Sequence, residues 1–282
     1  MKKMTILITL CVLSILSATV AAQKMKAEDV LAKHLDSIGE ADTRASIKSR
    51  VLIGEVKLRI KGGRLGEAGG PAILASEGDK HLIGMTLGST TYPYEKMGFD
   101  GKTLKVAYLR AGERSAIGNF FVSNPLFFRE GLIGGTLSSA WALSNSKSRE
   151  AKIEYNGLKK IGDLQLHEVT YLPKKGAEFS IKLYFDAENF RHVRSEYLRI
   201  VGATQGARLE DSARRTDTRY RVIEEFSDFK KESGLTLPHT YKMILSVFGQ
   251  GISASEQEWQ IQVIRFAFNQ NIPPESFDTE VK

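Results

Sequence analysis

Cysteine is almost absent from this sequence, and its one thiol, Cys11, lies in a segment that we expect the mature protein to lack. Two lysines near the first residue are followed by an uncharged apolar run from Met4 to Leu16 and then by small residues up to Ala22. This order is typical of a secretory signal peptide that is cleaved between Ala22 and Gln23. The apolar run is shorter than the roughly 20 residues that a membrane-spanning helix needs. A mature chain without thiols excludes disulfides, cysteine-ligated zinc, iron–sulfur clusters and cysteine nucleophiles.

A strong excess of one charge is also missing. The chain carries a formal charge of +7, and loss of the two lysines in the predicted signal peptide (residues 1–22) lowers it to +5 (7 − 2). These charges are spread along the chain, whereas nucleic-acid-binding proteins concentrate basic residues on one face or stripe. We therefore expect an exported, periplasmic monomer that has no nucleic-acid partner and is peripheral to a membrane at most.

Known catalytic motifs are missing as well, including the Gly-x-Ser-x-Gly elbow, the Walker loop and Gly-x-Gly-x-x-Gly after a strand. His167 and Glu168 resemble the start of His-Glu-x-x-His, but Tyr171 replaces the second zinc ligand and the segment alternates like a strand. Glu224 and Glu225 are neighbours on a predicted strand and point to opposite faces, which fits a solvated strand edge better than acid–base catalysis. We expect surface or core-edge positions for the other histidines: His34, His81, His192 and His239. The sequence thus predicts no catalytic residue, no metal site and no cofactor.

Most of the chain alternates apolar and polar residues with a period of two. Before this pattern begins, residues 27–38 predict a helix that ends at Gly39, and a short turn over residues 41–47 leads into the strands. The longest predicted strands cover residues 218–229, 237–248 and 256–268. Strands with one apolar and one polar face are typical of an antiparallel sheet that has one side in water. Since no linker divides the chain, we expect a single domain over residues 23–282.

Two stretches interrupt the alternation. Residues 202–217 are polar and charged and predict a loop. Residues 115–143 are apolar without a strict period, and Pro125 and Gly134-Gly135 divide them into short helices. This apolar stretch either plugs the core of the sheet or forms a lid over a concave sheet, with a ligand cavity beneath it. The pattern alone favours the plug, because protein interiors usually close-pack.

The order of these elements and several turn-and-strand sequences carry a family resemblance. They are Gly98-Phe99-Asp100-Gly101-Lys102, the run from Phe179 to Asp186, and Gly234-Leu235-Thr236-Leu237-Pro238. The chain resembles the outer-membrane lipoprotein carrier superfamily, the LolA/LolB-like or periplasmic lipoprotein-sorting-like proteins, over nearly all of its mature length. The resemblance implies a mainly β (α+β) fold: a curved, unclosed antiparallel β-barrel of about eleven strands with helices covering its concave side.

By the same resemblance, the concave face holds a lipid or the acyl chain of a lipoprotein for transport or sensing. The resemblance therefore favours the interpretation of residues 115–143 as a lid over a cavity and not as a plug. The apolar wall would consist of Val56, Leu58, Ile83, Met85, Leu104, Val106, Ile181, Leu183, Met243 and Leu245. The helical cover would contribute Phe120, Phe121, Phe127, Phe128, Leu132 and Trp141. We therefore expect a non-enzymatic lipid-binding protein. An envelope scaffold or signalling protein that docks another envelope protein is the alternative, and an envelope hydrolase with an unrecognised site is the third hypothesis.

Overall fold

The computed structural model describes residues 25–61, 66–145, 148–202, 217–249 and 252–279. The predicted signal peptide and most of the predicted polar loop over residues 202–217 lie outside them. The helix expected at residues 27–38 is present with those bounds as α1 (Ala27–Ile38), and α2 (Ala41–Ser46) follows it. The first strands are β1 (Ser49–Lys61), β2 (Glu67–Glu77), β3 (Lys80–Thr86), β4 (Tyr94–Phe99) and β5 (Leu104–Val106). The later ones are β6 (Lys152–Ile161), β7 (Leu164–Leu172), β8 (Ser180–Asp186), β9 (His192–Val201), β10 (Thr218–Glu232), β11 (Leu235–Gly249) and β12 (Ile252–Phe268).

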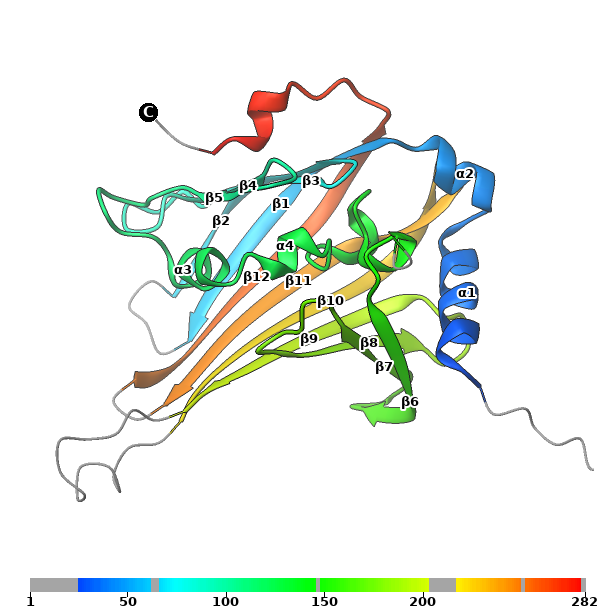
Figure 1. Ribbon diagram of the computed structural model, residues 1–282. Helices are drawn as coiled ribbons and strands as arrows, with labels where there is room; N and C mark the ends of the chain where they lie inside the picture. Colours follow the sequence, from blue (N-terminus) through cyan, green and yellow to red (C-terminus); the bar gives the residue numbers. More distant parts are fainter. Residues whose placement is uncertain (1–24, 62–65, 146–147, 203–216, 250–251, 280–282) are drawn as a thin grey trace, which may run out of the picture.

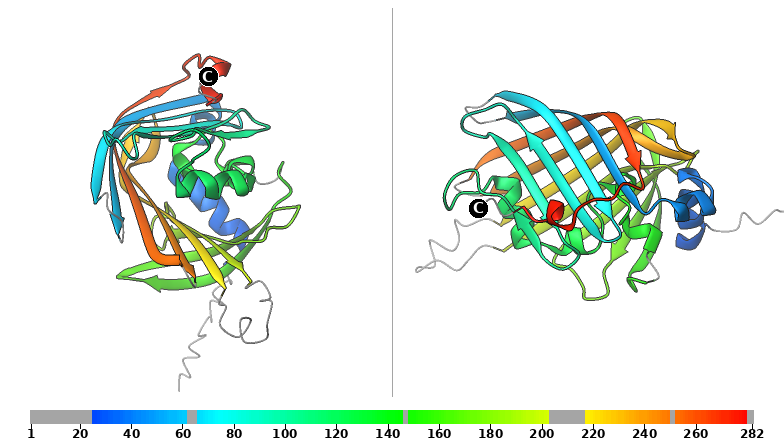
Figure 2. Two further views of the ribbon diagram at one scale, coloured as in Figure 1. Left: turned by 90° about the vertical axis from the view of Figure 1, so that its left-hand side faces the viewer. Right: turned by 90° about the horizontal axis from the view of Figure 1, so that it is seen from above.

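All of these strands form one sheet of twelve, in the order β5-β4-β3-β2-β1-β12-β11-β10-β9-β8-β7-β6. Neighbouring strands are antiparallel throughout, including the pair of β1 with the last strand, β12. The sheet is strongly curved, and its two edges, β5 and β6, do not pair within the described residues (Figures 1 and 2). The predicted fold class, an unclosed antiparallel barrel with helices on its concave side, is therefore confirmed, with twelve strands instead of about eleven.

A bulge at the centre of the sheet allows a local bend. The register between β1 and β12 shifts between Ile53 and Gly54. A Cβ atom at Gly54 would lie 2.3 Å from the carbonyl oxygen of Gln262 on β12, so the two backbones approach more closely than any other residue would permit. Bulges increase local twist and bend the strand, which helps the sheet to curl around its concave side.

The concave side is covered by the connection between the two edge strands. After β5 the chain forms α3 (Ala116–Ser123), α4 (Leu126–Arg129) and the short 3-10 helices η1 (Gly135–Leu137) and η2 (Ala142–Asn145), and then joins β6. We call residues 115–145 the crossing segment, since they run from one edge of the sheet to the other over its concave face (Figure 1). As predicted, Pro125 and Gly134 separate short helices, because Pro125 caps α4 and Gly134 precedes η1 with a positive φ.

Helices and a terminal segment complete the structure. Helix α1 covers one end of the concave side, while α3 lies at the opposite end (Figures 1 and 2). The 3-10 helix η3 (Pro274–Phe277) packs outside the barrel, where Phe277 forms a small second core with Leu82 and Ile272. None of the helices in the described part of the chain has the length and apolar character that crossing a bilayer requires.

Candidate ligand-binding site

The residues predicted to line an apolar site come together on the concave side. They share one hydrophobic cluster, in which Leu104 is half-buried and the others are buried: Val56, Leu58, Ile83, Met85, Val106, Phe120, Phe121, Phe127, Phe128, Leu132, Trp141, Ile181, Leu183, Met243 and Leu245. The residues on strands form the wall of the site, and the other residues of this list belong to the crossing segment. In this conformation the side chains of the crossing segment fill the deep part of the concave face.

Aromatic rings make up much of this filling near α3. The ring centroid of Phe127 lies 4.7 Å from that of Phe179 and 4.8 Å from that of Tyr197. Phe120 stacks on Phe127 at 5.7 Å and also approaches Tyr220 at 6.1 Å. Such ring pairs contribute dispersion and apolar burial without demanding one exact geometry, so another apolar group could replace them.

The middle of the crossing segment is held by a buried carboxyl group. Glu224 on β10 is fully buried, and its Oε1 accepts hydrogen bonds from the Gly134 amide (2.8 Å) and the Tyr241 hydroxyl (2.6 Å). Its Oε2 accepts from the Tyr197 hydroxyl (2.7 Å), which also lies 3.2 Å from the carbonyl oxygen of Leu132. Burial raises the pKa of Glu224, and the three donors oppose that shift. Glu224 thus joins the segment to β9, β10 and β11.

Further polar contacts fix the same part of the segment to β1, β2 and β3. The Arg50 guanidinium donates from Nη1 to the carbonyl oxygens of Thr136 and Ser138. Ser138 also shares a hydrogen bond with His81 on β3 (3.1 Å), and the Ser139 amide donates to Ser76 Oγ on β2 (2.8 Å). The region around η1 is therefore an anchor with polar ties to both halves of the sheet.

Helix α3 lacks ties of this kind. Its cap is local, since Ser115 Oγ accepts from the Gly118 amide at 2.8 Å. Asn124, just after the helix, donates to the carbonyl oxygen of Phe120 within the segment and accepts from Arg199 on β9. Within the described residues no hydrogen bond or ion pair joins residues 116–123 to a strand. Apolar packing therefore holds residues 116–123 of α3 against the sheet, while the hydrogen bond between Asn124 and Arg199 ties the C-terminal end of the helix to β9.

A pocket lies between α3 and the ends of β9 to β12. Its volume is about 540 Å³, within the range of small-molecule sites. Phe120, Tyr220, Leu245 and Val247 supply apolar surface, and Arg199 lies among the polar lining residues. We call this space the mouth pocket. Along the strands, the next concave-side residues beyond Leu245 and its partner Gln257 are Met243 and Trp259, which are paired across β11 and β12. The mouth pocket therefore adjoins the apolar wall.

A cluster of histidines lies at the other end of the concave side, where His34 of α1 approaches His192 of β9. His34 Nε2 accepts a hydrogen bond from Trp141 Nε1 (2.9 Å), so its Nδ1 carries the proton and donates to the Phe190 carbonyl oxygen (3.1 Å). Burial lowers the pKa of His34 to about 4, and also lowers that of His192, which stacks on Trp141. These neutral rings act as structural core residues.

Several polar residues do not lie where the sequence predicts them. Glu224 is buried, and not a solvated strand edge, although its neighbour Glu225 does point to the outer face and pairs there with Arg194. The four histidines expected at the surface or core edge are all buried: His34, His81, His192 and His239. The sequence does contain a signal for the burial of Glu224, because this residue lies between Val222 and Phe226 in the alternation of inward-facing residues.

The partial zinc motif occupies a strand, as expected. His167 on β7 shares a hydrogen bond with the Tyr155 hydroxyl (2.8 Å), while Glu168 pairs with Lys182 (3.1 Å). The Tyr171 hydroxyl donates to Glu130 (2.7 Å). Among the residues that the structure describes, no three histidine, cysteine, aspartate or glutamate side chains gather as a metal site would require.

The chain was compared with known protein families, curated proteins and solved structures. No protein-family profile and no curated protein matches the sequence. A structure described as an outer membrane lipoprotein-sorting protein domain from Vibrio parahaemolyticus is similar, with 11% identity, a TM-score of 0.46, and coverage of 89% of this chain and 97% of that one. A LolA superfamily protein from Nitrosomonas europaea is 12% identical (TM-score 0.45; 90% and 97% covered), and a DUF1329 family protein from Desulfovibrio piger is 8% identical (TM-score 0.41; 90% and 97% covered). All three TM-scores lie below 0.5, so the fold rests on the strand order and curvature of the structure itself.

Proposed function

We propose that this protein is a non-enzymatic periplasmic binding protein that takes up the acyl chain of a lipid or lipoprotein beneath α3. The observation that carries this proposal is the contrast along the crossing segment. Around η1, polar bonds to both halves of the sheet hold the chain in place. Along α3 the contacts with the sheet are apolar apart from the bond between Asn124 and Arg199 at its end, and the mouth pocket lies directly beside them.

The energetics favour exchange of α3 contacts for a ligand. Displacing α3 breaks few hydrogen bonds to the sheet, because none is present at the described residues 116–123 and the bond from Arg199 to Asn124 lies at the end of the helix. An acyl chain that enters the mouth pocket buries its methylenes against the surface that Phe120 covers, at about 0.8 kcal/mol per methylene. Arg199, at the same pocket, already donates to Glu178 and Asn124, which orders its side chain at the entrance. The anchor at η1 would keep the segment attached while α3 moves.

Filling the mouth pocket tests this proposal. Ser123 lines the pocket and is exposed at the end of α3, so Ser123→Trp places an indole in the space without removing a core contact. We expect the affinity for a fluorescent fatty acid to fall about tenfold or more, because several methylenes lose their burial site. Fluorescence titration of the purified protein measures the affinity, and native mass spectrometry of the unmodified protein should show co-purifying lipid.

The matched control is Val122→Trp. Val122 is the preceding residue on the same helix, is 38% exposed and does not line the pocket. This variant should bind the fatty acid as the original protein does. An equal loss of affinity in both variants would show that the indole acts through the stability of the helix. An unmodified protein that neither carries nor takes up a lipid would contradict the proposed function.

A further inference from the structure

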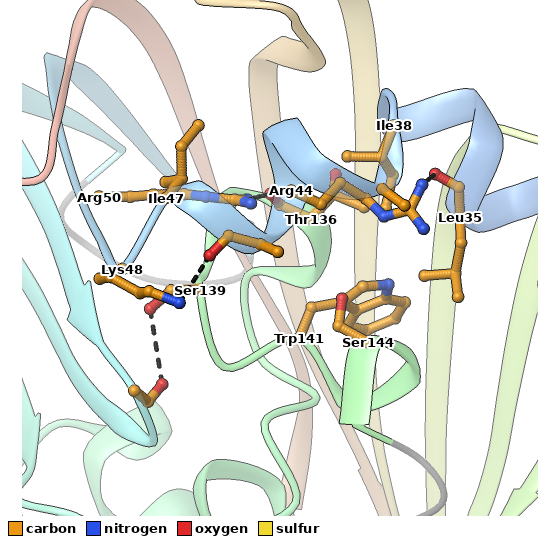
Figure 3. Close-up of a pocket in the computed structure, with 13 residues that line it drawn as sticks. Leu35, Ile38, Arg44, Ile47, Lys48, Arg50, Thr136, Ser139, Trp141 and Ser144 are labelled. Atoms are coloured by element: carbon orange, nitrogen blue, oxygen red, sulfur yellow. Dashed lines mark hydrogen bonds between the residues drawn. The ribbon is translucent and has the colours of Figure 1, made fainter.

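A second pocket lies at the opposite end of the concave side, beneath α1 and α2. It has a volume of about 380 Å³ and is bounded by the C-terminal end of α1, by α2, by the start of β1 and by the η1–η2 region (Figure 3). Arg44, Lys48 and Arg50 line it, and no aspartate or glutamate does. The apolar part of the lining includes Leu35 and Trp141. A pocket with such an imbalance of charge has a positive potential.

Arg50 is the most unusual of the three cations. The residue is only 8% exposed, and in the described part of the chain no carboxylate forms an ion pair with it. Nη1 donates to the carbonyl oxygens of Thr136 and Ser138, while buried Nε has no hydrogen-bond partner, as is also true of buried Thr136 Oγ1. Burial lowers the pKa of Arg50 to about 10, so the guanidinium stays charged at neutral pH. A buried cation without a counter-charge is costly, and such charges are normally paired.

Backbone oxygens, and not acids, orient the other two cations. Lys48 Nζ donates to the carbonyl oxygen of Ala45 (2.6 Å), and Arg44 Nη1 donates to that of Leu35 (2.7 Å). The carboxylate paired with Arg44 is that of Asp36, which is 3.8 Å away and 82% exposed. Because water screens an exposed pair, little of the positive charge in the pocket is compensated.

We propose that this pocket binds a phosphate group. Three cations with no lining acid match a phosphate, which carries about −1.5 to −2 charges at neutral pH, better than they match a singly charged carboxylate. Arginine provides the planar donor fork that phosphate oxygens accept, and Lys48 provides a point charge at the exposed rim. Leu35 and Trp141 would contact an apolar part of the same ligand, as in a phospholipid, but a free phosphate offers the same oxyanion. This site does not depend on the uptake of an acyl chain beneath α3.

Isothermal titration calorimetry at low, constant ionic strength tests the proposal with three probes: inorganic phosphate, glycerol 3-phosphate and soluble dihexanoyl phosphatidic acid. We expect saturable binding of all three at one site. Phosphatidic acid that binds at least about tenfold more tightly than glycerol 3-phosphate identifies a lipid headgroup as the source, because only the lipid adds apolar contacts. Equal affinities identify a free phosphate compound. If none of the probes binds, the proposal is wrong.

Variants locate the binding site. Lys48→Gln should weaken phosphate binding about fivefold, since one charge-assisted contact is lost, while thermal stability stays unchanged because Lys48 is exposed. Arg50→Gln should abolish binding, but it also loosens η1, so Lys48→Gln is the decisive variant. Lys57→Gln is the matched control: Lys57 is exposed on β1, the strand that follows Lys48, lies outside the pocket, and its loss changes the net charge equally. If Lys48→Gln and Lys57→Gln bind phosphate identically, the anion is held by net charge and not by this pocket.

Discussion

Glu224→Ala is expected to lower the free energy of unfolding by about 3–9 kcal/mol, because three buried donors lose their acceptor at about 1–3 kcal/mol each. Those donors are the Gly134 amide and the hydroxyls of Tyr197 and Tyr241. The loss should also release the crossing segment around η1, since Gly134 belongs to it. Urea denaturation measures the first effect, and hydrogen exchange of the amides near Gly134 measures the second.

Glu224→Gln separates the loss of hydrogen bonds from the loss of charge. Its amide oxygen can still accept from Gly134 and Tyr241, and its NH₂ group can donate to Tyr197, whose hydroxyl then turns to the Leu132 carbonyl oxygen, 3.2 Å away. Because the pKa of Glu224 is raised in the folded state, its contribution to stability is present below the unfolded pKa and is lost as pH rises through the folded pKa. Glutamine does not titrate, so its free energy of unfolding lacks this loss. As the pH rises from acidic to alkaline, Glu224→Gln should therefore become more stable relative to the original protein. An alanine variant as stable as the glutamine variant would contradict the role of Glu224 as an anchor.

Gly131→Ala is expected to be the most damaging single-methyl change in the crossing segment, at about 3 kcal/mol or more. Gly131 follows α4 with a φ of 66°, and a Cβ atom there would lie 1.9 Å from the carbonyl oxygen of Ala140. The same turn brings the Ala142 amide to the Gly131 carbonyl oxygen (3.0 Å), so the segment folds back on itself at this point. To relieve this clash, the backbone at Gly131 must move away from the backbone at Ala140. Thermal unfolding measures the cost.

Gly176→Ala provides the control for this variant. Gly176 has a similar φ of 71° in the connection between β7 and β8, but a Cβ atom would meet nothing within 4 Å. It should cost only the left-handed strain of about 1–2 kcal/mol. Similar losses in the two variants would mean that the turn at Gly131 is less tightly packed than the structure shows.

Local patterns were enough to predict most of the sheet. The strand expected at residues 218–229 extends to Glu232 as β10, and that expected at 237–248 begins at Leu235 as β11, because the tight turn at Ser233 and Gly234 joins them with positive φ at both residues. Alternation specifies a strand and its apolar face, since successive side chains point to opposite sides. The positions of the long strands therefore followed from local sequence patterns, whereas the curved, unclosed barrel was expected from the family resemblance.

The site was harder to predict because its ties join distant parts of the chain. No periodicity indicates that Gly134 donates to Glu224, or that Arg50 donates to Thr136. The question whether the crossing segment is a plug or a lid depends on such ties, which hold η1 and are missing at α3 within the described residues. The cationic pocket was not predicted either, because it also depends on contacts between distant parts of the chain. In the sequence, Arg44, Lys48 and Arg50 look like ordinary solvated charges.

Quenching of tryptophan fluorescence by a dibrominated fatty acid tests the uptake of an acyl chain beneath α3 most directly. The chain has two tryptophans: Trp259 lies next along the wall from the mouth pocket, while Trp141 hydrogen-bonds His34 of α1 at the other end of the concave side. Bromine quenches at near contact, so each single-tryptophan variant reports one end of the concave side. We predict saturable quenching in Trp141→Phe, where Trp259 remains, and little quenching in Trp259→Phe. No quenching in Trp141→Phe, or equal quenching in both variants, would contradict entry of the acyl chain at the α3 end.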